Sequence, residues 1–200
     1  MSYIATIPAE EAQGEVLELY ARQQGSKSYL PNYANVFCYR PGVMKAWAKM
    51  QEEIRSTVDF RRYELITLVA ALELKMSYCA LAHGEVLTRK FYSEEQLTAI
   101  VADSDNAELS EKERAMIQLA RKVVRDTSTI SSEDINTVRN QGFSEEEIFD
   151  IIAVAAARCF FAKIPDALGV QPDARFQSVP DKLRRLLVVG RGIAEEADKG

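Results

Sequence analysis

Apolar residues recur at intervals of three and four positions through much of this chain, the spacing that places them on one face of an α-helix. The segment after Asp59 shows this spacing at Leu65, Leu68, Val69, Leu72 and Met76. The segment from Pro41 to about Arg55 shows it at Val43, Trp47 and Met50. No window sustains the apolar–polar alternation of a β-strand. The pattern therefore predicts an all-α fold, a bundle of amphipathic helices.

Residues that favour helix ends divide the chain into segments. Pro8 begins a predicted helix that runs to Gln24, and Gly25 stands where its C-terminal cap would be. Asp59 can cap the helix that follows it. Three later segments begin with the Ser-x-x-Glu/Gln pattern of a capping box, which satisfies backbone amides that a helix leaves free. These boxes pair Ser93 with Gln96, Ser110 with Glu113, and Ser144 with Glu147.

Two parts of the chain resemble each other at one offset of 51 residues. Residues 65–68 match residues 116–119, and residues 92–97 match residues 143–148 in the same register. The shared offset predicts an internal duplication, with repeat halves at about 59–109 and 110–160.

The last part of the chain is predicted to add one more amphipathic helix, from Pro180 to about Glu196. Its apolar side carries Leu183, Leu186, Leu187 and Ile193. A polar connector, Gln171 to Pro180, precedes it, so the helix could pack on its own subunit or reach across to a neighbour.

Composition narrows the function classes. The 200 residues include 25 basic and 30 acidic side chains, and a net charge of −5 does not favour a nucleic-acid partner. The N-terminus lacks the pattern of a signal peptide, and the apolar stretch Ile151 to Ala157 is too short to span a membrane. Three widely spaced cysteines do not resemble a disulfide framework. We expect a cytoplasmic protein with reduced thiols and no membrane partner.

The candidate chemistry centres on His83, the single histidine of the chain. Ser77 is predicted to cap a helix, which places Cys79 in its first turn, where free amides favour a thiolate. Cys79 and His83 are four residues apart and share one helix face, within reach of a hydrogen bond. Glu64 on the preceding helix could orient the imidazole, provided that the next helix folds back or another subunit supplies the carboxylate. The second repeat half has Ile130 and Asp134 at the positions of Cys79 and His83.

A structural interpretation competes with this one, because a buried cysteine beside a buried histidine is often ordinary core. Cys38 and Cys159 have no nearby histidine and no capping position, so we interpret both as core. We expect no metal site, because His83 and Glu85 lie on different helix faces and no second histidine exists.

The segment from Tyr63 to His83 resembles the carboxymuconolactone decarboxylase / alkyl hydroperoxidase D-like family, most closely its peroxidase-related branch. The family signature is a Glu, then Cys-x-x-Cys, then a His four residues after the second Cys. Glu64, Cys79 and His83 occupy three of those four positions, whereas Met76 occupies that of the first cysteine. Tyr78 stands where some members place a second histidine of the proton relay.

Further segments extend the resemblance over about residues 4–176: Ile7-Pro8, Gly14 to Tyr20, Pro31-Asn32, Pro41 to Trp47, and Asp166 to Gly169. It implies a single helical domain of the alkyl hydroperoxidase D-like type over 1–176, with residues 177–200 as a C-terminal arm. It also implies a homo-oligomer (dimer, trimer or hexamer) with active sites near subunit interfaces. We expect no cofactor.

Because a thioether cannot form a disulfide, Met76 excludes the family's disulfide-cycling mechanism within this motif. Three interpretations remain. Cys79 could work alone as the thiol of a peroxidase, with a hydroperoxide as substrate and an external thiol as reductant. Alternatively, His83 could act as acid and base in a lyase on a small carboxylated substrate, with Cys79 lining the pocket. In the third, the site has decayed and the chain is a binding or structural oligomer. We favour the peroxidase, because the cysteine nearest the histidine is retained.

Overall fold

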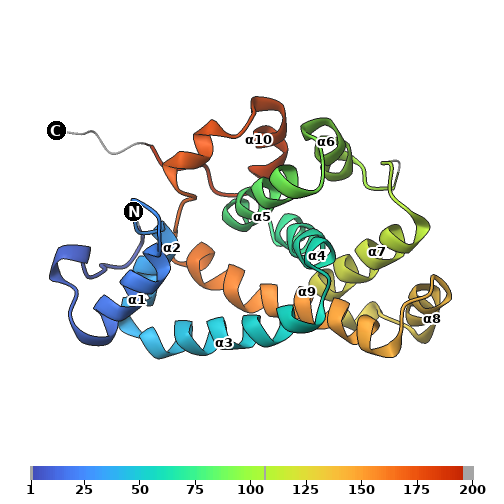
Figure 1. The fold of residues 1–200 in the computed structure, drawn as a ribbon, viewed down its shortest axis with the longest axis horizontal. Coiled ribbons are helices and arrows are strands. Elements are labelled where there is room, and N and C mark those ends of the chain that lie inside the picture. The colour runs from blue at the N-terminus through green and yellow to red at the C-terminus, as the bar shows by residue number, and fades with distance from the viewer. Residues whose placement is uncertain (1, 106, 196–200) are drawn as a thin grey trace.

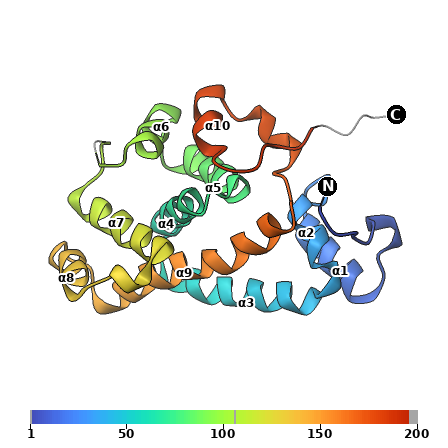
Figure 2. The same ribbon diagram turned by 180° about the vertical axis from the view of Figure 1, so that it is seen from behind.

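The computed structural model describes residues 2–105 and 107–195, and across these ranges every regular element is helical (Figures 1 and 2). The fold is therefore all-α, as predicted. The α-helices are α1 (Gly14–Gln24), α2 (Asn32–Asn35), α3 (Pro41–Thr57), α4 (Phe60–Glu73), α5 (Ser77–Lys90), α6 (Glu94–Ala102), α7 (Glu111–Arg125), α8 (Ser132–Asn140), α9 (Glu145–Ala167) and α10 (Asp181–Leu187). Short 3-10 turns occupy Ala9–Glu11, Val36–Tyr39, Thr127–Thr129 and Ala174–Ser178.

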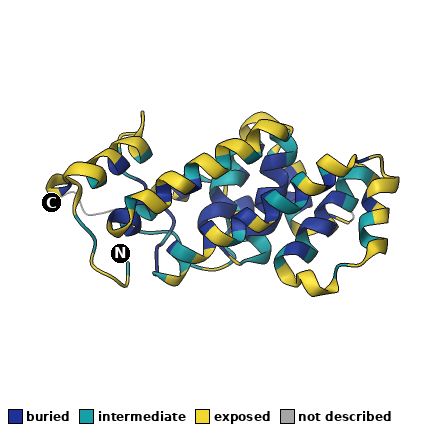
Figure 3. Ribbon diagram, turned by 90° about the horizontal axis from the view of Figure 1, so that it is seen from below, coloured by how far each residue is buried: buried dark blue, intermediate teal, exposed yellow. Residues whose placement is uncertain are grey.

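Helix α4 forms the centre of the bundle (Figure 1). Residues 63–71 are all buried, because α5, α7 and α9 pack around this helix. Figure 3 shows the buried residues gathered in the middle of the molecule, with exposed residues along the outer helix faces. Helix α3 runs beside α9 on one side of the bundle and also contacts α1. The central position of α4 is what makes Glu64 a candidate for chemistry, since a buried carboxylate needs a partner inside the protein.

The helix starts follow the capping signals closely. All three predicted capping boxes form, and Asp59 accepts a hydrogen bond from the Arg62 amide at the start of α4. A fourth box, Ser131 with Asp134, starts α8 and was not predicted. Asp134, which the repeat aligns with His83, thus serves as a cap. Each such cap stabilises its helix by about 1 kcal/mol.

Two predicted helix starts were wrong. The helix expected from Pro8 is a 3-10 turn followed by α1, because Ala12 and Gln13 adopt an extended backbone and the helix begins anew at Gly14. Ser77 is the first residue of α5 rather than its cap, and Met76 takes the cap position. The Ser77 hydroxyl instead accepts a hydrogen bond from the Gly190 amide at 2.9 Å, which ties the C-terminal segment to this turn.

The C-terminal helix is shorter than predicted and packs on its own chain. Helix α10 ends at Leu187, and the chain continues without helical structure past Gly190; Glu196 lies outside the described residues. The backbone at Gly190 passes so close to Lys75 that an added Cβ would lie 2.0 Å from the Lys75 carbonyl oxygen. Because α10 contacts α5 and α6, the arm covers the helix that carries the candidate site.

The internal duplication stays a prediction. The starts of α4 and α7, and those of α6 and α9, are both separated by 51 residues, whereas α5 and α8 do not keep this offset. Ile130, which the repeat aligns with Cys79, lies outside α8 at the end of a 3-10 turn. In the described part of the chain, no helix combines the length and apolar character needed to cross a bilayer.

Candidate functional site

Glu64 and His83 meet within one chain. Lys75, with a left-handed φ of 54°, helps to turn the chain between α4 and α5, so that α5 folds back along α4. This return brings the Glu64 carboxylate to 2.6 Å from Nδ1 of His83. A carboxylate can only accept there, so Nδ1 carries the proton in a neutral imidazole and the lone pair lies on Nε2. The pair is therefore set up as a base that Glu64 orients.

The surroundings of His83 favour its neutral form. Burial lowers the pKa of His83 below its usual 6.5, and the positive charges of Arg158 and Arg55 act in the same direction. The Glu64 carboxylate opposes them by stabilising the protonated ring. Because burial has the largest effect, the imidazole can accept a proton at neutral pH.

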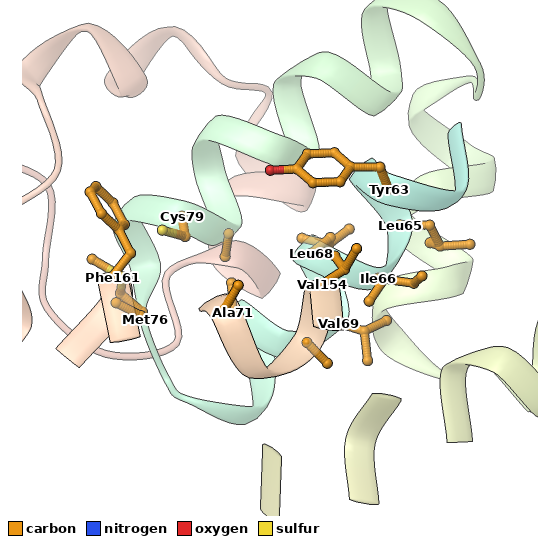
Figure 4. Close-up of a cluster of buried hydrophobic side chains, with 14 of the residues drawn as sticks. Tyr63, Leu65, Ile66, Leu68, Val69, Ala71, Met76, Cys79, Val154 and Phe161 are labelled. Carbon is orange, nitrogen blue, oxygen red and sulfur yellow. The ribbon is translucent and has the colours of Figure 1, made fainter. Parts of the chain in front are cut away.

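Cys79 lies beside Arg158 rather than His83. Its Sγ is 3.8 Å from a terminal guanidinium nitrogen of Arg158, and within the described residues no hydrogen bond joins it to the imidazole. Cys79 and His83, which the sequence placed within reach of a hydrogen bond, both lie on α5 but do not form that bond in this conformation. Figure 4 shows Cys79 inside a cluster of buried side chains, near Met76 and Phe161.

The thiol is also less acidic than the sequence suggested. Burial raises the pKa of Cys79 above its ordinary value, while the charge and hydrogen bond of Arg158 lower it and offset part of that rise. Position in the first turn of α5 does not outweigh the loss of water around the sulfur. In this conformation the resting group is a thiol, and Arg158 is the local cation that favours its ionisation.

Arg158 is a functional candidate that the sequence analysis did not identify. Its side chain is buried, and no carboxylate in the described ranges lies within ion-pair distance. The second terminal nitrogen bonds the Tyr63 hydroxyl at 3.3 Å and the Gln51 side-chain oxygen at 3.4 Å, while Nε has no partner. The guanidinium also lies over the ring of Trp47, 5.7 Å from its centroid. The sequence signal that could have identified Arg158 is a charged residue within the apolar segment of α9.

The other motif positions have structural partners. Met76 is buried, and the Tyr78 hydroxyl donates to the Asp173 carboxylate at 2.6 Å. Asp173 also accepts from the backbone amide of Asn32 at 2.8 Å. This buried carboxylate thus connects the start of α2 to the residue directly before Cys79. Burial and the Asp173 charge strongly raise the pKa of Tyr78, so its hydroxyl stays protonated.

The remaining cysteines lie elsewhere in the fold. Cys38 is buried, as expected, whereas Cys159 on α9 is partly exposed, which corrects its interpretation as core. All three cysteines are free thiols in this structure. Within the described residues, no group of three or more His, Cys, Asp or Glu side chains is arranged to hold a metal ion.

A groove of about 640 Å³ runs along α3 to the edge of the site. Its lining includes Trp47, Gln51 and Tyr63, three side chains that also contact Arg158. Arg55 lies at this groove with its guanidinium over the Tyr63 ring, 5.3 Å from the centroid. The groove therefore reaches side chains that contact Arg158 directly.

Comparisons with known proteins agree with this architecture. Residues 97–171 match the carboxymuconolactone decarboxylase family, a stretch that lies C-terminal to Cys79 and His83. The fold is similar to that of a peroxidase-related protein from Ralstonia eutropha (TM-score 0.74, 18% identity, 95% of this chain and 98% of that chain). A peroxidase-related protein from a Silicibacter species also matches (TM-score 0.72, 21% identity, 88% and 91%).

The debrominase Bmp8 has a similar fold as well (TM-score 0.70, 16% identity, 92% of this chain and 95% of that chain), seen in a cysteine-to-alanine variant with 2,3,4-tribromopyrrole. No curated protein matches the sequence. Sequence identities this low establish a shared fold, and the family match adds a relationship in sequence. Residues 97–171 are therefore similar in sequence to the carboxymuconolactone decarboxylase family, and the chain has the fold of the alkylhydroperoxidase D-like, peroxidase-related proteins.

Proposed function

We propose that this protein is a thiol-dependent, peroxidase-like oxidoreductase in which Cys79 is the single attacking thiol. The observation that carries the proposal is Arg158, a buried guanidinium that faces Cys79 Sγ at 3.8 Å and has no carboxylate partner among the described residues. A buried cation without a counter-charge is costly, and a thiolate on Cys79 would supply that charge. The buried Arg158 guanidinium therefore favours ionisation of the Cys79 thiol.

The reaction needs one cysteine and an external thiol. The Cys79 thiolate attacks the terminal, hydrogen-bearing oxygen of a hydroperoxide, the O–O bond breaks, and the leaving alkoxide takes a proton to become an alcohol. The resulting sulfenic acid reacts with a first external thiol to form a mixed disulfide and water. A second external thiol then displaces Cys79 and leaves as a disulfide. Met76 cannot resolve the sulfenic acid, which is why the reductant must come from outside.

The Glu64–His83 pair would handle the protons of this sequence. A neutral imidazole with Nε2 free can take the proton that the thiol or the peroxide gives up, and can return it to the leaving alkoxide. Glu64 holds the ring in that tautomer through the 2.6 Å hydrogen bond. Because Cys79 and His83 are not bonded to each other in the resting site, substrate or water would carry the proton between them.

Two comparisons support cysteine chemistry in this fold. Proteins described as peroxidase-related share it over nearly their whole length. The debrominase Bmp8, seen with 2,3,4-tribromopyrrole in a cysteine-to-alanine variant, shares the fold as well. A hydroperoxide oxygen and an aryl bromine are both electrophilic atoms that a thiolate can attack.

The test measures peroxide consumption with a monothiol or dithiol reductant in the wild-type protein and in Cys79→Ser. Cys159→Ser is the matched control, because Cys159 is a free thiol on another face. We expect Cys79→Ser to abolish turnover and Cys159→Ser to preserve it. Equal turnover in Cys79→Ser and the wild type would refute the proposal.

A lyase that uses His83 is the second candidate. The observation favouring it is that the Glu64–His83 pair is complete without Cys79. Such an enzyme would act on a small carboxylated substrate, with His83 moving a proton and Cys79 lining the pocket. Its signature is activity that is lost in His83→Gln but survives Cys79→Ser, the variant in which the peroxidase should lose all turnover.

A further inference from the structure

One face of α9 is largely exposed, and a row of side chains along it has a regular order; we call this row the seam. Along this helix, side chains spaced alternately by three and four residues share one face. The seam consists of Glu146, Phe149, Ala153, Ala156, Phe160 and Lys163. Phe149 is 70% exposed and Phe160 is 47% exposed, and both are large aromatic side chains in contact with water. Exposed aromatic residues aligned on one helix are unusual in a protein without a partner there.

The types of residue along the seam follow the same order from either end. From either end it runs charged, aromatic, alanine, alanine, aromatic, charged. If an identical helix lies antiparallel to α9, with the twofold axis between residues 154 and 155, Phe149 faces the partner's Phe160. Ala153 then faces the partner's Ala156, where two small side chains let the helices approach closely. A twofold interface requires this kind of self-complementary surface.

The charges at the two ends obey the same symmetry. Under that axis Lys163 faces the partner's Glu146, and the pairing occurs twice. Both side chains are exposed, and Lys163 makes no ion pair within the described residues. Opposite charges placed symmetrically about the centre of an apolar stripe fit a second copy of the same chain better than an unrelated partner.

We infer that a second copy of this chain docks on α9 in antiparallel orientation, along the seam from Glu146 to Lys163. The inner face of the same helix carries Arg158, and Phe160 packs on Trp47, whose ring lies beside the Arg158 guanidinium. The interface would therefore lie directly behind the candidate site. This inference does not depend on the proposed reaction.

Charge exchange is the first test. Sedimentation velocity over a range of concentrations should show a species of twice the 22.5 kDa chain. Lys163→Glu places two like-charged pairs at the ends of the seam and should weaken association about tenfold. The double variant Glu146→Lys with Lys163→Glu restores opposite charges and should recover association. A wild-type protein that stays monomeric at 50 µM, about the concentration of a weak dimer, would overturn the inference.

Crosslinking tests the register. In a Cys159→Ser background, Ala153→Cys and Ala156→Cys are prepared separately and mixed under mild oxidation. The mixture should give more covalent dimer than either variant alone, because residue 153 faces residue 156 of the partner. Phe149→Asp should abolish association, whereas the control Leu17→Asp, at an exposed leucine on α1, should not. An association that survives Phe149→Asp and gives no selective crosslink contradicts the proposed interface.

Discussion

Arg158 and Cys79 face each other across 3.8 Å inside the bundle, one side chain on α9 and the other at the start of α5. The cation is buried, and the described residues offer it a thiol, a phenol and an amide but no carboxylate. The packing of α9 and α5 on α4 therefore places a positive charge beside the Cys79 sulfur. The charge and hydrogen bond of Arg158 lower the pKa of the Cys79 thiol and offset part of the rise that burial causes.

Arg158→Met should have opposite effects on the stability of the fold and on the reactivity of the Cys79 thiol. Methionine keeps much of the side-chain volume and removes a buried charge without a counter-ion, so the free energy of unfolding should be unchanged or higher by about 1–2 kcal/mol. The pKa of Cys79 should rise, because the charge and hydrogen bond of Arg158 lower it in the wild type, and alkylation of the thiol should slow about tenfold at fixed pH. Urea unfolding and iodoacetamide kinetics measure the two effects. A clear loss of stability with unchanged alkylation would show that Arg158 is a structural residue only.

His83 should make folding stability depend on pH. Because burial lowers its pKa in the folded state, the unfolded chain binds the proton first as the pH falls. The contribution of His83 is therefore fully present above about pH 6.5 and is lost as the pH drops below that value. The difference in unfolding free energy between wild type and His83→Gln, measured from pH 8 to pH 5, isolates this effect.

The single histidine also gives a direct reading of its titration, because any imidazole signal in the NMR spectrum belongs to His83. We expect a midpoint below 6.5 and, at neutral pH, the proton on Nδ1. Glu64→Gln should shift the midpoint further down, since it removes the charge that stabilises the protonated ring. A midpoint at or above 6.5 in the wild type would contradict our description of this pair.

Tyr78 and Asp173 should be energetically coupled. Tyr78→Phe leaves one buried carboxylate oxygen without its 2.6 Å donor, and should cost about 1–3 kcal/mol of stability. Asp173→Asn should cost a similar amount, and the double variant should lose less than the sum. Chemical denaturation of the four proteins supplies the cycle. Additive losses would mean that this hydrogen bond does not hold the start of α5.

Gly84 tests whether the C-terminal arm packs on its own chain. A Cβ at this position would lie 2.7 Å from a methyl group of Leu187, so Gly84→Ala should destabilise the fold by about 1–3 kcal/mol. Leu187→Ala removes the obstructing methyl groups and should make the alanine at position 84 tolerable. Thermal unfolding of both single variants and the double variant checks this compensation. Independent effects would place Leu187 away from α5 in solution.

The helical fold was predictable because its signals are local. Capping boxes and apolar spacing are read from residues a few positions apart, and three of the four boxes were found this way. The errors arose where tertiary contacts decide the backbone: Ser77 bonds Gly190 instead of capping α5, and the chain after Leu187 leaves the helix to pass against Lys75. Neither contact can be predicted from the neighbouring residues in the sequence.

The site was predictable only in part, for the same reason. Glu64 and His83 were candidates by residue type, and the return of α5 along α4 brings them together. Arg158 lies 79 residues from Cys79, and only the packing of α9 shows that it meets the thiol. Cys79 is less acidic than predicted, because its position in the helix could be predicted from the sequence whereas its burial, which raises its pKa, could not.

Trapping of the sulfenic acid on Cys79 tests the central claim most directly. In a Cys38→Ser, Cys159→Ser background, the protein is treated with hydrogen peroxide and a dimedone probe, and the adduct is located by mass spectrometry across a range of pH. We predict an adduct on Cys79 that increases with pH as the thiol ionises, and that falls about tenfold in Arg158→Met at fixed pH. No adduct on Cys79 at any pH, or the same yield in both proteins, would contradict the role assigned to the Arg158–Cys79 pair.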